Sequence, residues 1–556
     1  MGPVHRLFVA IVVAPALACA TAGGRGAGDA LRRSGSAAYA VADRELAADA
    51  QVRHALARVT FGARPGDVER VRAEGVDRWI DRQLDPARIP DPAAAAVVAR
   101  YPDLGRSAGE LLAAYPPPGQ LLARQAAAVT AEDSARLRGM RRASYAFVGA
   151  LQAARVGRAV AAERQLQEVV TDFWLGHFNV FVGKDRVRYA LPEFDAAVRA
   201  HAMGRFRDLL GAVAKSPAML QYLDNWRSVA DSAHPTLAQV RGVRARPRAG
   251  RGLNENYARE LLELHTLGVD GGYTQQDVTE VARALTGWSV RLPAEGGGGF
   301  VFRPAAHDAG AKTILGHQFP AGRGQDEGER VLDLLARHPS TARFIARKLS
   351  VRFVSDTPPP TLVERAAAAF TRSDGDLRAT LAVILHSPEF FSRAAYRAKV
   401  KMPFELVVSA ARALGAPPDS TPRTAQLVGR LGQPLWGHQA PDGWPETGAP
   451  WVNTGSILAR INFGGAVAAG RVPGVRLAAW PSYVALRDAS RAAQIDGVVA
   501  ALLGGEASPD TRTVLASGAN PLAPAAADGM LAAARGADPL AQLVGLALGA
   551  PEFQRR

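Results

Sequence analysis

Apolar residues recur every three or four positions over most of the chain, and this spacing most constrains the fold. It is clear at residues 68–84 and continues through stretches rich in Ala, Leu, Val and Arg at 87–114, 118–171 and 193–230. Such spacing gathers apolar side chains on one face of a helix. Because 48% of the 556 residues are hydrophobic, the chain can bury a large core. We therefore predict an all-α fold, a large multi-helix body.

Two stretches depart from the helical pattern. Residues 296–320 begin with glycines and alternate in the manner of β-strands, which predicts a small β-hairpin insertion. Residues 432–453 are rich in Gly, Pro and Trp, which predicts an aromatic loop. Two further helices are predicted at 253–267 and 274–288, the second capped by Thr274 and Asp277, because a short polar side chain satisfies free N–H groups at a helix start.

The first residues have the composition of a secretory signal. His5 and Arg6 precede an apolar run at residues 7–17 that is too short to span a bilayer as a mature helix. We predict a signal segment at 1–18, a flexible tether at 19–42, a helical core at 43–475 and a C-terminal helical part at 476–556. The protein is expected to be exported to the periplasm or cell envelope.

Cys19 is the only cysteine, and it lies at the end of the signal segment. Signal peptidase I could use the Ala-Leu-Ala pattern at residues 16–18, and Cys19 would then have no special role, whereas a lipoprotein pathway would cut before Cys19 and acylate its thiol. Cys19 is thus the candidate lipidation site. Since no other cysteine exists, the mature body can form no disulfide, thiolate metal site or cysteine nucleophile.

The net charge of +15 raises the question of an acidic partner. Nearly all of the basic residues are Arg and only six are Lys, and they are scattered among Ala-rich helices. This pattern, together with export, argues against nucleic acid as a partner. The expected partners are a cell-envelope glycan or another exported protein, and contact with the membrane is expected only through a lipid anchor on Cys19.

The first candidate site lies on the predicted helix at 253–267. Asn256, Arg259, Glu260 and Glu263 fall within about a third of the helix circumference, and Asn254 lies just before them. Two carboxylates one turn apart, an Arg that keeps one ionised and amides that orient a ligand suit acid/base catalysis. The alternative is a network of salt bridges between packed helices. His265 points away from this ridge, which favours a buried role.

The second candidate site is the run Asp-Phe-Trp-Leu-Gly-His-Phe-Asn at residues 172–179. His177 and Asn179 are surrounded by aromatic residues, where a dry pocket could hold a titratable base and a substrate-binding amide. In the alternative interpretation, His177 caps a helix end beside Gly176.

The third candidate site is the aromatic loop, where His438, Asp442 and Trp444 are predicted to bind substrate. Flat indole faces suit sugar rings, and binding residues concentrate on structured loops. In the alternative interpretation, the tryptophans pin the loop to the body. His307, Asp308 and His317 on the predicted hairpin could add ligands.

No cofactor is identified from the sequence. Metal binding by His177, Glu260, Glu263 or His307 is conceivable, although no H-E-x-x-H spacing is present. The chain also lacks a G-x-S-x-G elbow, a Walker loop and a dinucleotide fingerprint, which disfavours serine hydrolases and nucleotide-driven enzymes.

Several runs together resemble one large bacterial family, domain of unknown function 1800. They are His-Ala-Leu-Ala-Arg-Val-Thr-Phe-Gly at 54–62, the run at 172–179, Leu-Asn-Glu-Asn-Tyr-Ala-Arg-Glu-Leu-Leu-Glu-Leu-His-Thr-Leu-Gly at 253–268, Gly-Tyr-Thr at 272–274 with Ala-Leu-Thr-Gly-Trp at 284–288, and Ala-Pro-Asp-Gly-Trp-Pro at 440–445. The resemblance implies an exported, mostly helical protein and carries no established activity.

These observations favour an envelope enzyme, a hydrolase or lyase that acts on a glycan or similar polymer. Glu260 and Glu263 would transfer protons, Arg259 and Asn256 would orient them, and His177 would be an auxiliary base. The alternative is a non-enzymatic, envelope-tethered binding or assembly protein.

Overall fold

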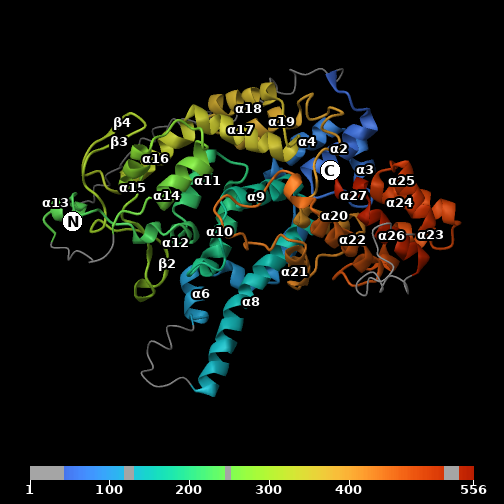
Figure 1. The fold of residues 1–556 in the computed structure, drawn as a ribbon, viewed down its shortest axis with the longest axis horizontal. Helices are drawn as coiled ribbons and strands as arrows, with labels where there is room; N and C mark the ends of the chain where they lie inside the picture. Colours follow the sequence, from blue (N-terminus) through green and yellow to red (C-terminus); the bar gives the residue numbers. More distant parts are fainter. Residues whose placement is uncertain (1–42, 118–129, 244–251, 519–537) are drawn as a thin grey trace, which may run out of the picture.

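The computed structural model describes residues 43–117, 130–243, 252–518 and 538–556. The predicted signal segment, the tether and Cys19 lie outside the described residues. Helices account for most of the described chain, and the strands are short (Figure 1). The prediction of an all-α body with a small β insertion is therefore confirmed.

Among the first described helices, α2, α3 and α4 lie beside the C-terminal helices, α6 lies apart from them, and α8 projects away from the body (Figure 1). The side chains that α8 buries begin at Ser144, so its first half extends beyond the core. The elements are α2 (Ala48–Val59), α3 (Asp67–Glu74), α4 (Val76–Gln83), η2 (Pro86–Arg88), α5 (Pro92–Ala99), η3 (Pro102–Gly105), α6 (Ala108–Ala114) and α8 (Ala131–Ala161).

The middle of the chain supplies the helices that hold the candidate sites. The predicted helix at 253–267 is present as a short α-helix followed by a π-helix, and the one at 274–288 ends at Ala284. The elements are α9 (Gln165–His177), α10 (Val187–His201), α11 (Phe206–Ala214), α12 (Pro217–Tyr222), η4 (Asn225–Arg227), α13 (Leu237–Val240), α14 (Asn256–Glu260), the π-helix η5 (Leu261–Thr266) and α15 (Gln275–Ala284).

The β insertion consists of two antiparallel pairs and begins earlier than predicted. Trp288 opens β1 (Trp288–Arg291), which pairs with β2 (Gly298–Phe302) across η6 (Pro293–Glu295). The second pair joins β3 (Lys312–Ile314) to β4 (His317–Phe319). Trp288 lies within the range predicted as a helix, and the difference arises because an indole suits both an apolar helix face and a strand.

The later helices complete the body, and Pro358 and Pro359 lie in the break between α17 and α18. The C-terminal helices gather beside α2 to α4 (Figure 1). The elements are α16 (Gln325–Arg337), α17 (Pro339–Phe353), α18 (Pro360–Arg372), α19 (Leu377–Leu385), α20 (Pro403–Ala413), α21 (Arg423–Arg430), η7 (Ala449–Trp451), α22 (Thr454–Ala468), η8 (Leu477–Ala479), α23 (Pro481–Leu486), α24 (Arg491–Leu503), α25 (Pro509–Ser517), α26 (Pro539–Gly549) and α27 (Pro551–Gln554).

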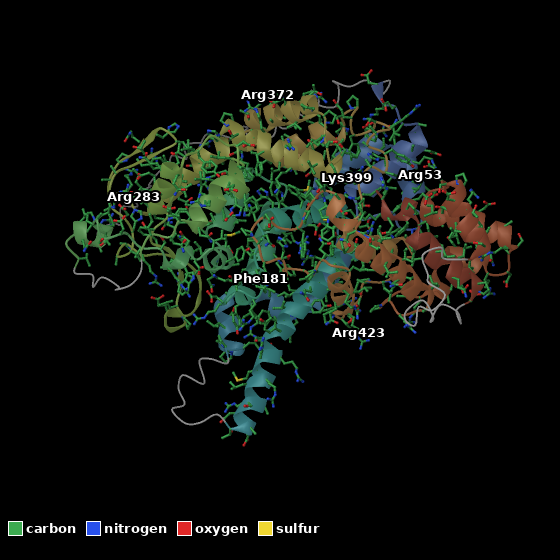
Figure 2. All side chains as sticks on the ribbon, in the orientation of Figure 1. Arg53, Phe181, Arg283, Arg372, Lys399 and Arg423 are labelled. Carbon is green, nitrogen blue, oxygen red and sulfur yellow. The ribbon has the colours of Figure 1, made fainter. Side chains whose placement is uncertain are left out.

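One large hydrophobic core runs through the described residues from α2 to α27. Charged side chains are not confined to the surface: Arg372 and Arg423 are exposed, whereas Lys399 is only 1% exposed at the meeting of the N- and C-terminal helices (Figure 2). Among the described helices, none is both long enough and apolar enough to cross a membrane.

Candidate functional site

The end of α9 packs against the π-helix. His177 is 3% exposed, and its Nε2 atom lies 3.1 Å from the carbonyl oxygen of His265. A carbonyl can only accept, so Nε2 carries the proton. Burial lowers the pKa of His177 well below its ordinary value, and the charge of Lys348 lowers it further. His177 is therefore a neutral imidazole held in one tautomer.

The π-helix η5 follows directly after Glu260. The hydroxyl of Thr266 donates to the carbonyl of Leu261 at 2.6 Å, and the amide of Leu267 donates to Leu262 at 2.8 Å, the five-residue spacing of a π turn. Such turns are rare and occur often at functional sites. Burial of the apolar side chains at Leu261 and Leu262 fixes this turn in the core.

Glu260 is half-buried at the start of that turn. Burial raises its pKa, and the charges of Glu263 and Asp442 raise it further, while Arg259 opposes them. Glu263 accepts a hydrogen bond from the Tyr273 hydroxyl at 3.1 Å. Glu260 therefore holds its proton to a higher pH than an ordinary glutamate, which is the property of a general acid.

The aromatic loop is fastened over the end of α9. Asn179 donates from Nδ2 to the carbonyls of His438 and Ala440 at 3.1 and 2.7 Å. The Tyr222 hydroxyl donates to the carbonyl of Gln439 at 2.6 Å. Gly443, at φ 73°, lies so close to α9 that an added Cβ would be 2.0 Å from the carbonyl oxygen of Gly176.

The negative charge of Asp442, in this loop, acts on three other residues of the site. Burial is the largest cause of the raised pKa values of Glu260 and Tyr222, and the charge of Asp442 raises both further. The same charge opposes the lowering of the pKa of Lys348 by burial. The carboxylate of Asp442 lies 2.9 Å from Nε2 of His438 and is 65% exposed. The aromatic loop thus packs against the second motif at Gly176 and Asn179, and the charge of its Asp442 acts on Glu260 of the first.

Lys348 on α17 was not predicted from the sequence. It is half-buried, and its ammonium lies 5.4 Å from the centre of the Phe344 ring. Burial lowers its pKa to about 8, against the charges of Glu446 and Asp442. In the sequence, the one indication of Lys348 was its residue type, because Lys is rare in a chain that otherwise uses Arg.

Three residues of the first candidate site, Arg259, Asn254 and Asn256, are hydrogen-bonded to neighbouring parts of the fold. Arg259 pairs with Glu255 at 3.5 Å and donates to Gln275 at 2.9 Å. Asn254 and Asn256 each donate to a carbonyl just beyond α12, at 3.4 Å. These contacts attach α14 to α12 and α15.

Trp444 is half-buried, with its ring 4.5 Å from that of His438 and 5.8 Å from that of Trp451. The indole of Trp451 in turn donates to the carbonyl of Pro445 at 2.9 Å. The indoles therefore help to hold the loop in shape.

A buried ion-pair network lies beneath the site. Arg352, one turn after Lys348, is fully buried and pairs with Asp172 at 3.1 Å, Glu405 at 3.0 Å and Glu446 at 3.2 Å. Asp172 also pairs with Arg155 at 2.5 Å. The network joins α9, α17, α20 and the aromatic loop, so it fixes the distances between the elements that carry the candidate residues.

The described residues contain no group of three or more His, Cys, Asp or Glu side chains arranged to hold a metal ion. His307 lies in a separate buried cluster, 3.5 Å from Glu327. The ammonium of Lys312 lies 2.6 Å from Glu327 and 3.7 Å from Asp308, the position a cation would take. His317 is exposed on β4.

The comparisons with known proteins agree with the motifs. The model of the family described as "Protein of unknown function (DUF1800)" matches residues 54–555. None of the curated proteins and none of the solved structures matches the chain. Because the match covers nearly the whole sequence, the chain belongs to the DUF1800 family of proteins of unknown function.

Proposed function

We propose that the protein is an exported enzyme of the cell envelope that cleaves a glycan or similar polymer by acid/base chemistry, hydrolytic or eliminative. The observation that carries the proposal is that Glu260, Lys348 and Tyr222 all have shifted pKa values and all feel the charge of Asp442. Shifted pKa values that converge on one place, contributed by segments far apart in sequence, are typical of catalytic sites.

In this proposal Glu260 donates a proton to the leaving oxygen. Lys348 serves as the base, because with a pKa of about 8 roughly a tenth of its amine is free at pH 7. His177 stays neutral and positions the π-helix through the His265 carbonyl. His438, Asp442 and Trp444 form the surface on which the polymer rests. Glu263, one turn after Glu260, raises the pKa of Glu260 further and is itself held by the Tyr273 hydroxyl.

The test compares the wild type, Glu260→Gln and Glu255→Gln for release of soluble fragments from cell-envelope glycans. Glu255 lies one turn earlier, where it is bound by Arg259, Gln275 and Thr279, so it is a matched control. We expect the loss of the acid to lower the rate about 100-fold or more, with the control near wild type. Folded wild-type protein that leaves every glycan intact would exclude the enzyme proposal.

A second candidate function is a non-enzymatic binding or assembly protein tethered to the envelope. It is favoured by the number of polar groups in the motifs that are engaged internally, such as Asn179, Tyr222 and Glu446. Glycan pull-down distinguishes the two functions: a binding protein retains the intact polymer, and Glu260→Gln retains it equally well.

We also propose that export ends with a lipid anchor on Cys19, since this cysteine precedes a Gly-rich tether. Labelling cells with a fatty-acid analogue tests the anchor. Incorporation that disappears in Cys19→Ala is expected, and no incorporation in the wild type means that the signal is cut elsewhere.

A further inference from the structure

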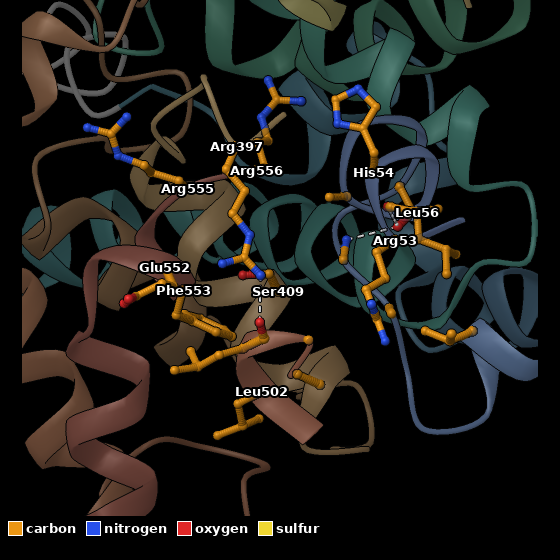
Figure 3. Close-up of a pocket in the computed structure, with 18 of the residues that line it drawn as sticks. Arg53, His54, Leu56, Arg397, Ser409, Leu502, Glu552, Phe553, Arg555 and Arg556 are labelled. Atoms are coloured by element: carbon orange, nitrogen blue, oxygen red, sulfur yellow. Dashed lines mark hydrogen bonds between the residues drawn. The ribbon is translucent and has the colours of Figure 1, made fainter. Parts of the chain in front are cut away.

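A cavity of about 370 Å³ opens between α2, α20, α24 and the final residues of the chain (Figure 3). It is separate from the site described above, and none of the predicted catalytic or substrate-binding residues lines it. Its lining includes the apolar side chains of Leu56, Leu502 and Phe553. The volume falls in the range of sites that enclose small molecules.

The cavity wall carries an excess of positive charge. Six Arg and Lys side chains line it, against three glutamates. Two of those glutamates are already bound: Glu405 pairs with Arg352 at 3.0 Å and with Arg556 at 2.9 Å, and Glu552 accepts from Ser508 and Thr511. Three of the six cations have a carboxylate partner, namely Arg72 with Asp49, Arg397 with Glu506 and Arg556 with Glu405, whereas within the described ranges no carboxylate lies within 4.0 Å of Arg53, Lys401 or Arg555.

Lys401 is the least compensated of these cations. It is 8% exposed, its ammonium lies 3.8 Å from the centre of the Phe553 ring, and within the described ranges no carboxylate lies within 4.0 Å of it. Burial lowers its pKa to about 7, helped by the charges of Arg556 and Arg397 and opposed by Glu405. A buried ammonium without an anionic partner costs the fold free energy.

Arg397 and Arg53 approach the same space from two sides. The guanidinium of Arg397 donates to the carbonyl of Leu503 at 2.5 Å, a contact drawn in Figure 3, and it is 3.5 Å from Glu506. Arg53 is half-buried on α2 and lines the cavity. Cations and apolar side chains that share one enclosed wall suit a ligand with a charged head and an apolar body.

We propose that this cavity binds a small organic anion, a carboxylate or a phosphate ester with an apolar body. Lys401 and the neighbouring arginines bind the anionic group, and Leu56, Leu502 and Phe553 contact the apolar part. The proposal stands apart from the glycan-cleaving function, because its residues belong to other elements of the chain.

Calorimetry on the full chain tests the proposal with three probes of one shape: naphthalene-2-carboxylate, 2-naphthyl phosphate and the neutral naphthalene-2-methanol. We expect saturable binding of an anion at one site and no binding of the alcohol. The anion that binds more tightly identifies the preferred head group. Lys401→Met should weaken anion binding about tenfold or more, the value of one charge-assisted hydrogen bond.

Lys215→Met is the control, since it removes a lysine that pairs with Glu329 and belongs to neither site. Its anion binding should equal that of the wild type. Lys401→Met replaces a buried ammonium with an apolar side chain, so its melting temperature should not fall. The proposal is overturned if neither anion binds, if the alcohol binds equally well, or if folded Lys401→Met binds like the wild type.

Discussion

Lys348 and Lys401 differ from the other four lysines at the level of single contacts. Each of the four lies within 4.0 Å of a carboxylate, namely Lys184 with Asp224, Lys215 with Glu329, Lys312 with Glu327 and Lys399 with Asp356. The sequence shows that Lys is rare, but it cannot show which of the six lacks a partner. That depends on residues brought together only by folding.

The free amine of Lys348 can be measured directly, because acylating reagents react with the unprotonated form. A pKa of about 8 against the ordinary value near 10.5 predicts labelling well above that of the ion-paired Lys215 at pH 7.5. The labelling rate at Lys348, followed by peptide mass spectrometry, should reach half its plateau near pH 8. A rate that still rises through pH 9.5 would contradict the lowered pKa.

Substitution of Gly443 tests whether the aromatic loop must lie close to the end of α9. Gly443→Ala places a Cβ 2.0 Å from the Gly176 carbonyl oxygen at a φ of 73°, so the loop must move. Gly316→Ala is the control, at φ 76° with nothing within 4 Å of the added Cβ, and it carries the backbone strain alone. We expect Gly443→Ala to lose about 2 kcal/mol of unfolding free energy or more and the control about 1. Equal losses in urea titrations would mean that the close approach is not needed.

Whole elements were predictable where local chemistry decides them. The cap formed by Thr274 and Asp277 is present, because it needs only side chains three residues apart. The π-helix after Glu260 was not predicted, since the same apolar spacing fits an α-helix and the wider turn is selected by packing in the core. The geometry of the most distinctive motif was therefore beyond the sequence.

His386, the residue that follows α19, attaches it to α4. Its two ring nitrogens lie 3.0 Å from Asp77 and 3.0 Å from Asp81, and these hydrogen bonds overcome burial to raise the pKa of His386 to about 9. A raised pKa stabilises the fold fully below the ordinary value near 6.5, and the contribution is lost as the pH rises through 9.

His386→Gln should thus lower the unfolding free energy by about 1–2 kcal/mol at pH 6, less than the full shift implies because both aspartates face solvent. At pH 10 the variant and the wild type should be equally stable. His317→Gln, on exposed β4, should change stability by less than about 0.5 kcal/mol at either pH. A loss at His386 that does not depend on pH would point to packing alone.

At the scale of the molecule, segments distant in the sequence meet in one charged interior. Asp172, Glu405 and Glu446 converge on Arg352 from α9, α20 and the aromatic loop. Glu405 also pairs with Arg556, which lines the 370 Å³ cavity, so the cavity and the candidate site share one network. The sequence predicted the helices and the three motifs separately, but the network that joins them depends on contacts such as that between Asp172 and Arg352, 180 positions apart.

Arg352 therefore connects the candidate site to the cavity, and we expect its replacement to destabilise the whole fold. Arg352→Met leaves two buried carboxylates, Asp172 and Glu405, and the half-buried Glu446 without their shared cation, which should cost about 3–5 kcal/mol of unfolding free energy. Arg343→Met on the same helix removes an exposed pair with Glu364, at 3.4 Å with both side chains 61% exposed, and should cost less than about 1 kcal/mol. Urea unfolding followed by tryptophan fluorescence measures both, because Trp444 and Trp451 report on the loop that Glu446 fastens. Equal losses in the two variants would show that the network merely fills the interior and that the loop is held by its backbone hydrogen bonds to Asn179 and Tyr222.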